Sequence, residues 1–212
     1  MQFQPHIIEK LRHRLQLPLP GEEAQFRMAP SYRPRLSKEQ IAAYNPRISA
    51  VLIVLYEQDG QLTTALTQRH AYQGVHGGQM SFPGGKREEG DPDLIHTALR
   101  EAEEEIGVKR DELELLGQLS ELYIPPSNFL VQPVIAFMPG QRQFTPQANE
   151  VEKIVEIPLN YFMDDANVNL QTEIKLFNGT IVRVPAVTYK GHVIWGATAI
   201  IISELVWLLK EL

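Results

Sequence analysis

Residues 100–108 read Arg-Glu-Ala-Glu-Glu-Glu-Ile-Gly-Val, and they follow a Gly-rich segment, Phe-Pro-Gly-Gly, at residues 82–85. On a helix, residues three and four apart are neighbours, so the carboxylates of Glu101, Glu104 and Glu105 can converge. Clusters of oxygen ligands suit hard divalent cations such as Mg²⁺ or Mn²⁺ and are typical of enzymes that act on phosphates. The run therefore predicts a metal site, with these three glutamates as ligands.

The helix around this run is expected to begin at Asp91, a good N-cap, with Pro92 at its first position. It should end at Gly107, where a glycine commonly stops a helix. Apolar residues recur in steps of four, three and four and predict a buried stripe: Ile95, Leu99, Ala102 and Ile106. The three glutamates should fall on roughly the opposite side.

A solvated acidic face is the simpler interpretation of such a helix, but three features argue against it. The cluster lies toward the helix C-terminus, where the macrodipole disfavours negative charge. Few lysines stand four residues away to offset the repulsion, and a glycine pair precedes the helix at a distance that lets a loop fold back over it. Clustered like charges are costly unless a cation joins them, which favours metal binding.

Composition agrees with an enzyme that has an ordinary core. The chain has 212 residues, 43% of them hydrophobic, and a net charge of −6. The acidity disfavours binding to nucleic acid, which needs a basic surface. Without cysteine, neither a disulfide nor a thiolate metal site can form. We expect no membrane span and a cytoplasmic location, because the longest apolar stretch, near residues 200–209, is too short to cross a bilayer.

Local patterns predict strands mixed with a few helices, and hence an α/β fold with a mixed sheet. Two turns, at Asp59-Gly60 and Asn178-Gly179, predict β-hairpins. We expect helices at residues 4–16, 37–44 and 198–209, and strands at residues 48–57, 62–68, 113–122, 131–138, 153–157, 173–177 and 180–189. Residues 18–36 and 70–90 should be loops.

The sequence resembles the Nudix hydrolase family, whose box reads G-x5-E-x7-R-E-U-x-E-E-x-G-U with U apolar. Residues 100–108 match every fixed position of its second half. The first half departs, since Asp91 stands where the family has Glu, and eight residues rather than seven separate it from Arg100. The resemblance implies a Nudix-type α/β/α sandwich.

A second resemblance is to the coenzyme A pyrophosphatase branch of that family, with a signature close to LLTxRSxxLRxHxGQxxFPGG. It rests on these matches: Thr67, Arg69, His76, Gly78, Gln79, Phe82, Pro83, Gly84 and Gly85. His70, Gln73 and Gly74 replace the Ser, Leu and Arg of the signature. Segments at residues 133–134, 149–159 and 194–199 also resemble this branch, so the likeness runs from about residue 48 onward.

The resemblance implies that water attacks a pyrophosphate linkage with the help of Mg²⁺ or Mn²⁺ held by Glu101, Glu104 and Glu105. Arg100 is expected to orient a carboxylate through a bidentate pair. The backbone of Gly84 and Gly85 should let metal or phosphate approach closely. Glu150 is a candidate further ligand or general base, or else a surface glutamate before a strand.

Three residues of the branch signature are expected near the substrate: Arg69, His76 and Gln79. Arg69 could contact a ligand phosphate, or pair with a structural carboxylate instead. Three functions remain open: a coenzyme A pyrophosphatase, a Nudix pyrophosphatase acting on ADP-ribose or another nucleoside diphosphate derivative, and a ligand sensor that has lost catalysis.

We expect a single domain over residues 1–212, with an N-terminal extension at residues 1–45 and a Nudix core at residues 46–212. The expected partner is a small molecule with a pyrophosphate linkage, not a nucleic acid or a membrane. Homodimers are common in the family that the chain resembles, so residues 1–45 are a candidate interface.

Overall fold

A strongly apolar run forms strand β1 (Arg47–Gln58), which lies at the centre of the fold. It pairs in parallel with β7 (Phe129–Met138) and antiparallel with β2 (Gln61–Arg69). Most of its side chains are buried on both faces, which is typical of a strand covered by helices on either side. The computed structural model covers residues 3–70, 78–140, 143–176 and 178–212.

Within these residues the main sheet has eight strands, and the parallel β1–β7 pair makes it a mixed sheet. The path runs β3-β2-β1-β7-β5, while β4 pairs with β1, β6 with β7 and β8 with β2. The further strands are β3 (Met80–Ser81), β4 (Gly84–Lys86), β5 (Glu114–Gln118), β6 (Leu122–Ile124) and β8 (Val151–Pro158). A second sheet has the order β11-β10-β9 and comprises β9 (Val168–Lys175), β10 (Ile181–Tyr189) and β11 (His192–Trp195).

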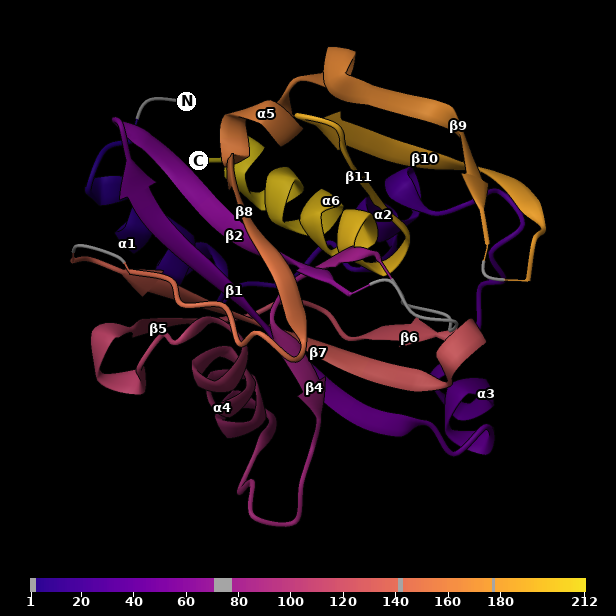
Figure 1. Cartoon of the computed structure of the whole chain (residues 1–212), viewed down its shortest axis with the longest axis horizontal. Coiled ribbons are helices and arrows are strands. Elements are labelled where there is room, and N and C mark those ends of the chain that lie inside the picture. Colours follow the sequence, from indigo (N-terminus) through magenta and orange to yellow (C-terminus); the bar gives the residue numbers. More distant parts are fainter. Residues whose placement is uncertain (1–2, 71–77, 141–142, 177) are drawn as a thin grey trace.

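Helices cover both faces of the main sheet, so the mixed α/β sandwich expected from the sequence is confirmed (Figure 1). On one face, α4 (Leu94–Ile106) packs over the side of β1 that carries Leu52 and Val54. On the other face, α1 (His6–Arg14) and α6 (Gly196–Lys210) cover Ile53 and Leu55. The α4 interface is rich in alanine, which lets the helix approach the sheet closely.

Residues 18–36, expected to be a loop, contain helix α2 (Glu22–Gln25) and a 3₁₀ turn (Phe26–Met28). The cause is Glu204, a fully buried carboxylate in the apolar helix α6. It accepts hydrogen bonds from the Gly21 N–H (3.1 Å), Gln25 Nε2 (3.0 Å) and Ser120 Oγ (2.6 Å). This long-range contact folds the segment, and no local pattern could show it.

The start of α4 corrects one prediction, because Asp93 rather than Asp91 is the N-cap and Pro92 precedes the helix. The Asp93 carboxylate accepts the backbone N–H of His96 at 2.8 Å and also contacts the His96 ring at 2.7 Å. Asp91 is instead turned inward and buried. The predicted end at Gly107 is confirmed, with φ of 74°.

The bounds of several other helices and strands differ modestly from those expected from the sequence. The helix expected at residues 37–44 is α3 (Lys38–Ala43), which begins with a capping box formed by Ser37 and Gln40. The strand expected at residues 113–122 is divided into β5 and β6, with a register shift beside Gly117. The loop expected at residues 70–90 contributes the short strands β3 and β4, and α5 (Leu159–Met163) and β11 were not expected at all. The expected strand end at Phe177 lies outside the described residues.

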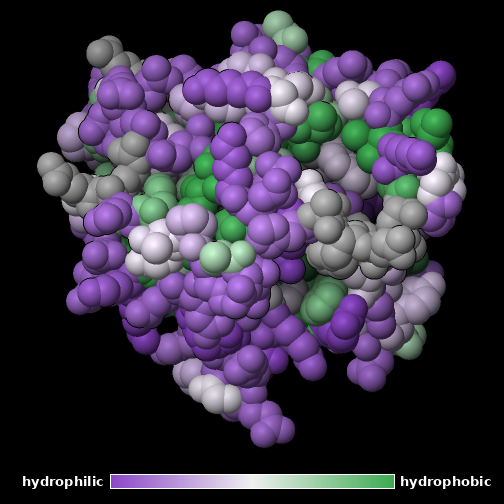
Figure 2. All heavy atoms as spheres, viewed as in Figure 1, coloured by the Kyte–Doolittle hydropathy of each residue, from purple (hydrophilic) through white to green (hydrophobic). Residues whose placement is uncertain are grey.

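Figure 2 shows a mostly hydrophilic face, with hydrophobic atoms gathered in the region where Figure 1 places β9 and β10. Leu170 on β9 and Ile181 on β10 are among the exposed large hydrophobic residues, at 58% and 63% exposure. In the part of the chain that the structure describes, no helix has the length and apolar character needed to span a bilayer.

The β1–β4 contact leads to a stability prediction. A Cβ at Gly84 would lie 2.4 Å from the carbonyl oxygen of Ala50, so Gly84→Ala must separate two paired backbones. We expect it to lower the free energy of unfolding by about 1–3 kcal/mol in urea titrations. Gly90→Ala, whose Cβ would meet nothing within 4 Å, is the matched control and should change little. Equal stability of both variants would contradict this packing.

Candidate active site

The glycine pair lies directly against the acidic helix. Pairing of β4 with β1, Gly85 opposite Ala50, places this backbone beside α4. A Cβ at Gly85 would come within 2.5 Å of the carboxylate of Glu101, so only glycine lets that carboxylate rest on the strand. The missing side chain at Gly85 therefore brings β4 to a carboxylate of the acidic cluster, whereas approach of metal or phosphate to this backbone stays a prediction.

Arg100 links the acidic groups on the solvent side of the helix. Its Nε and Nη2 atoms donate to the two oxygens of Asp91 at 3.0 and 2.9 Å, a bidentate pair. Nη1 donates to Glu101 at 2.9 Å and lies 3.4 Å from Glu104. Nη2 also donates to the carbonyl of Lys86 in β4 at 3.2 Å. Arg100 thus orients Glu101, as expected, but its bidentate partner is Asp91.

Glu105 occupies a different environment from the other glutamates. Its side chain is 3% exposed, whereas that of Glu104 is 59% exposed, so the expectation that all three lie opposite the apolar stripe is wrong for Glu105. Its oxygens accept hydrogen bonds from Arg69 Nη2 at 3.1 Å and from the Gly84 N–H at 3.3 Å. Arg69 also donates to the Gly84 carbonyl at 3.1 Å. Glu105 therefore joins β2, the glycine pair and α4.

For Arg69 the geometry favours the alternative of a structural pair with a carboxylate. Its guanidinium is engaged by Glu105 and Gly84, and contact with a substrate phosphate stays a prediction. The Gln79 carbonyl accepts the Arg69 N–H at 3.3 Å, so Gln79 lies beside the same strand end. His76 lies outside the described residues, and its role stays a prediction as well.

Glu150 is brought toward the helix by the loop before β8. The N–H groups of Thr145 and Gln147 donate to the carbonyls of Ile106 and Glu105 at 2.9 and 3.0 Å, which satisfies the C-terminal end of α4. Glu150 follows at the start of β8 and is exposed. Its negative charge is one cause of the raised pKa values of both Glu101 and Glu105. Glu150 is therefore close enough to the acidic cluster for its charge to act on Glu101 and Glu105.

The pKa values reflect how unfavourable the clustering is. Burial raises the pKa of Glu105 to about 7, against the opposing effects of Arg69 and Gly84, and the charges of Glu101 and Glu150 add to the rise. Burial also raises the pKa of Glu101, although Arg100 acts in the opposite direction. The hydrogen bonds from Arg100 hold the pKa of Asp91 well below its usual range.

The residues present fit a hard divalent cation by their chemistry. They offer carboxylate oxygens, and the absence of a side chain at Gly85 lets the Glu101 carboxylate lie directly against the β4 backbone. Among the described residues, no three acidic or histidine side chains already converge on one point. Arg100 and Arg69 neutralise the carboxylates instead, so an ion would compete with these two guanidinium groups.

Comparison with known proteins identifies the family. The family model described as the NUDIX domain matches residues 46–172. The chain is similar to "Uncharacterized Nudix hydrolase NudL" of Photorhabdus laumondii, with 35% identity over 76% of this chain and 84% of that protein. It is also 37% identical to "Nudix hydrolase 15, mitochondrial" of Arabidopsis thaliana over 74% of this chain, but it spans only 56% of that relative's length. The chain belongs to the Nudix family.

Solved structures are more distant. A MutT/nudix family protein from Enterococcus faecalis has 17% identity and a TM-score of 0.48, over 99% of this chain and 76% of that chain. The NUDIX domain of NrtR from Shewanella oneidensis, solved with ADP ribose, has 21% identity and a TM-score of 0.43, over 59% and 85%. At these scores the family assignment rests on the sequence matches. The expected single domain stays a prediction, because the family model covers residues 46–172 alone.

The Gly85 contact leads to a prediction that separates metal binding from stability. The methyl group of Gly85→Ala would meet the end of the Glu101 side chain rather than backbone, so the fold should survive while the carboxylate is displaced. We expect Mn²⁺ affinity, followed by electron paramagnetic resonance, to fall at least about tenfold. Urea unfolding should change by less than about 1 kcal/mol. Unchanged Mn²⁺ affinity would contradict a role for this contact in metal binding.

The raised pKa of Glu105 leads to a second prediction. The folded-state pKa of Glu105, about 7, exceeds the ordinary value of 4.5. Protonated Glu105 therefore contributes fully to the stability of the fold at acid pH, and this contribution is lost as the pH rises through 7. The loss should amount to about 3 kcal/mol in metal-free protein. Glu105→Gln lacks this titration, so its stability relative to wild type should increase between about pH 5 and 8. Urea titrations in EDTA test this, and a pH-independent difference would contradict it.

Proposed function

We propose that the protein is a divalent-metal-dependent hydrolase of a pyrophosphate linkage, with coenzyme A or a derivative as substrate. The products would be 3′,5′-ADP and 4′-phosphopantetheine or its acyl form. The main support is the contact between Glu101 and the Gly85 backbone, because it unites the two halves of the Nudix box in one place. Mg²⁺ or Mn²⁺ is the proposed cofactor, with Glu101, Glu104 and Glu105 as ligands.

When bound, such an ion lowers the pKa of water and neutralises charge on phosphoryl oxygens. The protein's own residues prepare the site for this chemistry. Arg100, fixed by Asp91, holds Glu101 in place, and Arg69 holds Glu105 against the Gly84 N–H. Glu150, exposed at the start of β8, is the proposed further ligand or general base.

The choice of coenzyme A rests on the branch signature. Of its residues, Arg69 supports Glu105 and Phe82 is buried in the core, so these two contribute to the architecture of the site. Because architectural residues do not select a substrate, hydrolysis of ADP-ribose or another nucleoside diphosphate derivative is the second candidate. A ligand sensor that has lost catalysis is the third, and the retention of all three box glutamates speaks against it. A homodimer and a cytoplasmic location remain predictions.

Activity measurements with a panel of substrates test the proposal. With Mg²⁺, the panel should include coenzyme A, dephospho-coenzyme A, acyl thioesters, ADP-ribose and nucleoside triphosphates, with products identified by mass spectrometry. Selective release of 3′,5′-ADP would support the coenzyme A assignment, whereas selective cleavage of ADP-ribose would support the second candidate. No hydrolysis of any substrate would favour the sensor.

Variants of the acidic helix test the assignment of residues. Glu101→Gln and Glu105→Gln should each lower kcat/KM at least about 100-fold, because a metal ligand is worth several kcal/mol in the transition state. Glu103→Gln removes the same charge from an exposed position of the same helix and should retain activity. Near-normal turnover of both ligand variants would defeat the assignment.

A further inference from the structure

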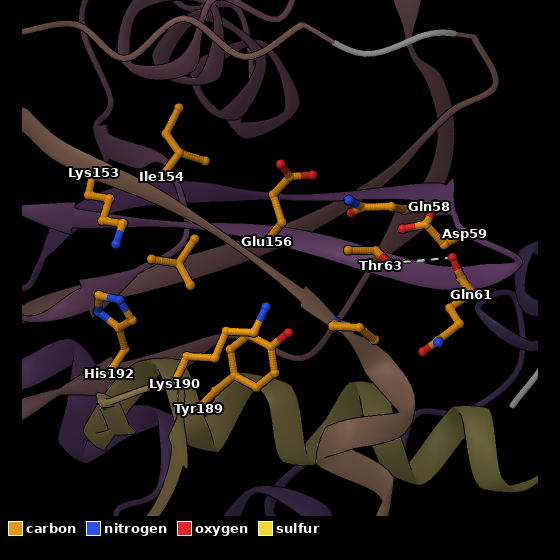
Figure 3. Close-up of a pocket in the computed structure, with 12 residues that line it drawn as sticks. Gln58, Asp59, Gln61, Thr63, Lys153, Ile154, Glu156, Tyr189, Lys190 and His192 are labelled. Atoms are coloured by element: carbon orange, nitrogen blue, oxygen red, sulfur yellow. Dashed lines mark hydrogen bonds between the residues drawn. The ribbon is translucent and has the colours of Figure 1, made fainter.

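A cavity of about 410 Å³ lies between the edge strand β8 and the turn that joins β10 to β11 (Figure 3). Its volume is within the range of small-molecule sites, which is roughly 300–1,000 Å³. The β1–β2 hairpin closes one end through Gln58, Asp59 and Gln61. We propose that this cavity is a metal-independent binding site for a small phosphorylated molecule, distinct from the acidic site on α4.

Three basic side chains line the cavity: Lys153 from β8, and Lys190 and His192 from the β10–β11 turn. Figure 3 shows Lys153 and His192 at the end of the cavity away from the hairpin, with Lys190 and Tyr189 between. No carboxylate among the described residues forms an ion pair with any of the three, although Lys190 Nζ lies 5.0 Å from the centre of the Tyr189 ring. Two lysine ammonium groups and an imidazole without acidic partners suit a phosphate.

The two acidic groups of the cavity lie apart from its basic end. Glu156 accepts a hydrogen bond from Tyr56 Oη at 2.8 Å, which holds its carboxylate toward the α4 side of the sheet, and Figure 3 shows it pointing away from Lys153 and Lys190. Asp59 lies at the hairpin end, with the carboxamides of Gln58 and Gln61. The cavity thus has a basic end and an end that can hydrogen-bond to hydroxyl or amide groups. This division fits a phosphomonoester with a polar second half, such as a nucleoside monophosphate.

The basic end is on the other side of the sheet from the acidic helix. The side chain of Leu66 in β2 belongs to the core under α6, and Gln68, two residues further, faces the same side. Lys153 is paired with Gln68 and therefore shares this side of the sheet. Arg69, one residue further, points to α4 and contacts Glu105. Because neighbouring residues of a strand face opposite sides, a ligand held by Lys153 would be separated by the sheet from Glu105. The proposed site can therefore be tested without the hydrolytic reaction.

The test is titration of AMP and inorganic phosphate into metal-free protein in EDTA, followed by isothermal calorimetry and by amide chemical shifts. We expect saturable binding of AMP, with shifts in β8 and in the β10–β11 turn. The double variant Lys153→Gln/Lys190→Gln should raise the Kd at least about tenfold. The control Lys38→Gln/Lys175→Gln removes equal charge from exposed positions elsewhere and should change the Kd less than about twofold.

Three results would overturn the proposal: no saturable binding of either probe, equal affinity of the Lys153/Lys190 variant and wild type, or loss of binding in Glu101→Gln. The last result would place the phosphate on the α4 side of the sheet.

Discussion

Two arginines offset the electrostatic repulsion among the carboxylates of the acidic site. Several carboxylates lie close together, and two of them, Asp91 and Glu105, are buried, an arrangement that is costly without compensating charge. Arg100 neutralises Asp91 and Glu101, and Arg69 neutralises Glu105. Both guanidinium groups also donate to carbonyls of β4, at Lys86 and Gly84. The same contacts therefore balance the charge and hold the glycine pair against the helix.

Much of this arrangement could be predicted from the sequence, because local patterns specify it. The helix that ends at Gly107, its apolar stripe and the hairpin at Asp59-Gly60 follow from spacing and turn chemistry, and the structure contains all three. The glycine pair beside the helix was expected too. The sequence pattern could not predict which residue each polar side chain contacts in the folded protein.

Asp91 illustrates that limit. Two aspartates precede the helix, and both are acceptable N-caps by residue type. The choice of Asp93 depends on Arg100, which draws Asp91 inward nine positions away along the chain. Glu105 is similar, since it lies at the border of the apolar stripe and its burial depends on β4, whose Gly84 N–H donates to it. Arg69 could be identified as important by its motif, but only the fold shows that Glu105 is its partner.

The buried carboxylate of Glu204 has a consequence for the boundaries of the folded unit. Two of its hydrogen-bond donors, the Gly21 N–H and Gln25 Nε2, come from the segment that precedes the family-matched region. A shortened chain that begins at residue 46 would keep Ser120 but leave part of this carboxylate desolvated and unmatched. The segment before residue 46 thus supplies hydrogen-bond donors to the buried carboxylate of α6, and removing it should destabilise the fold.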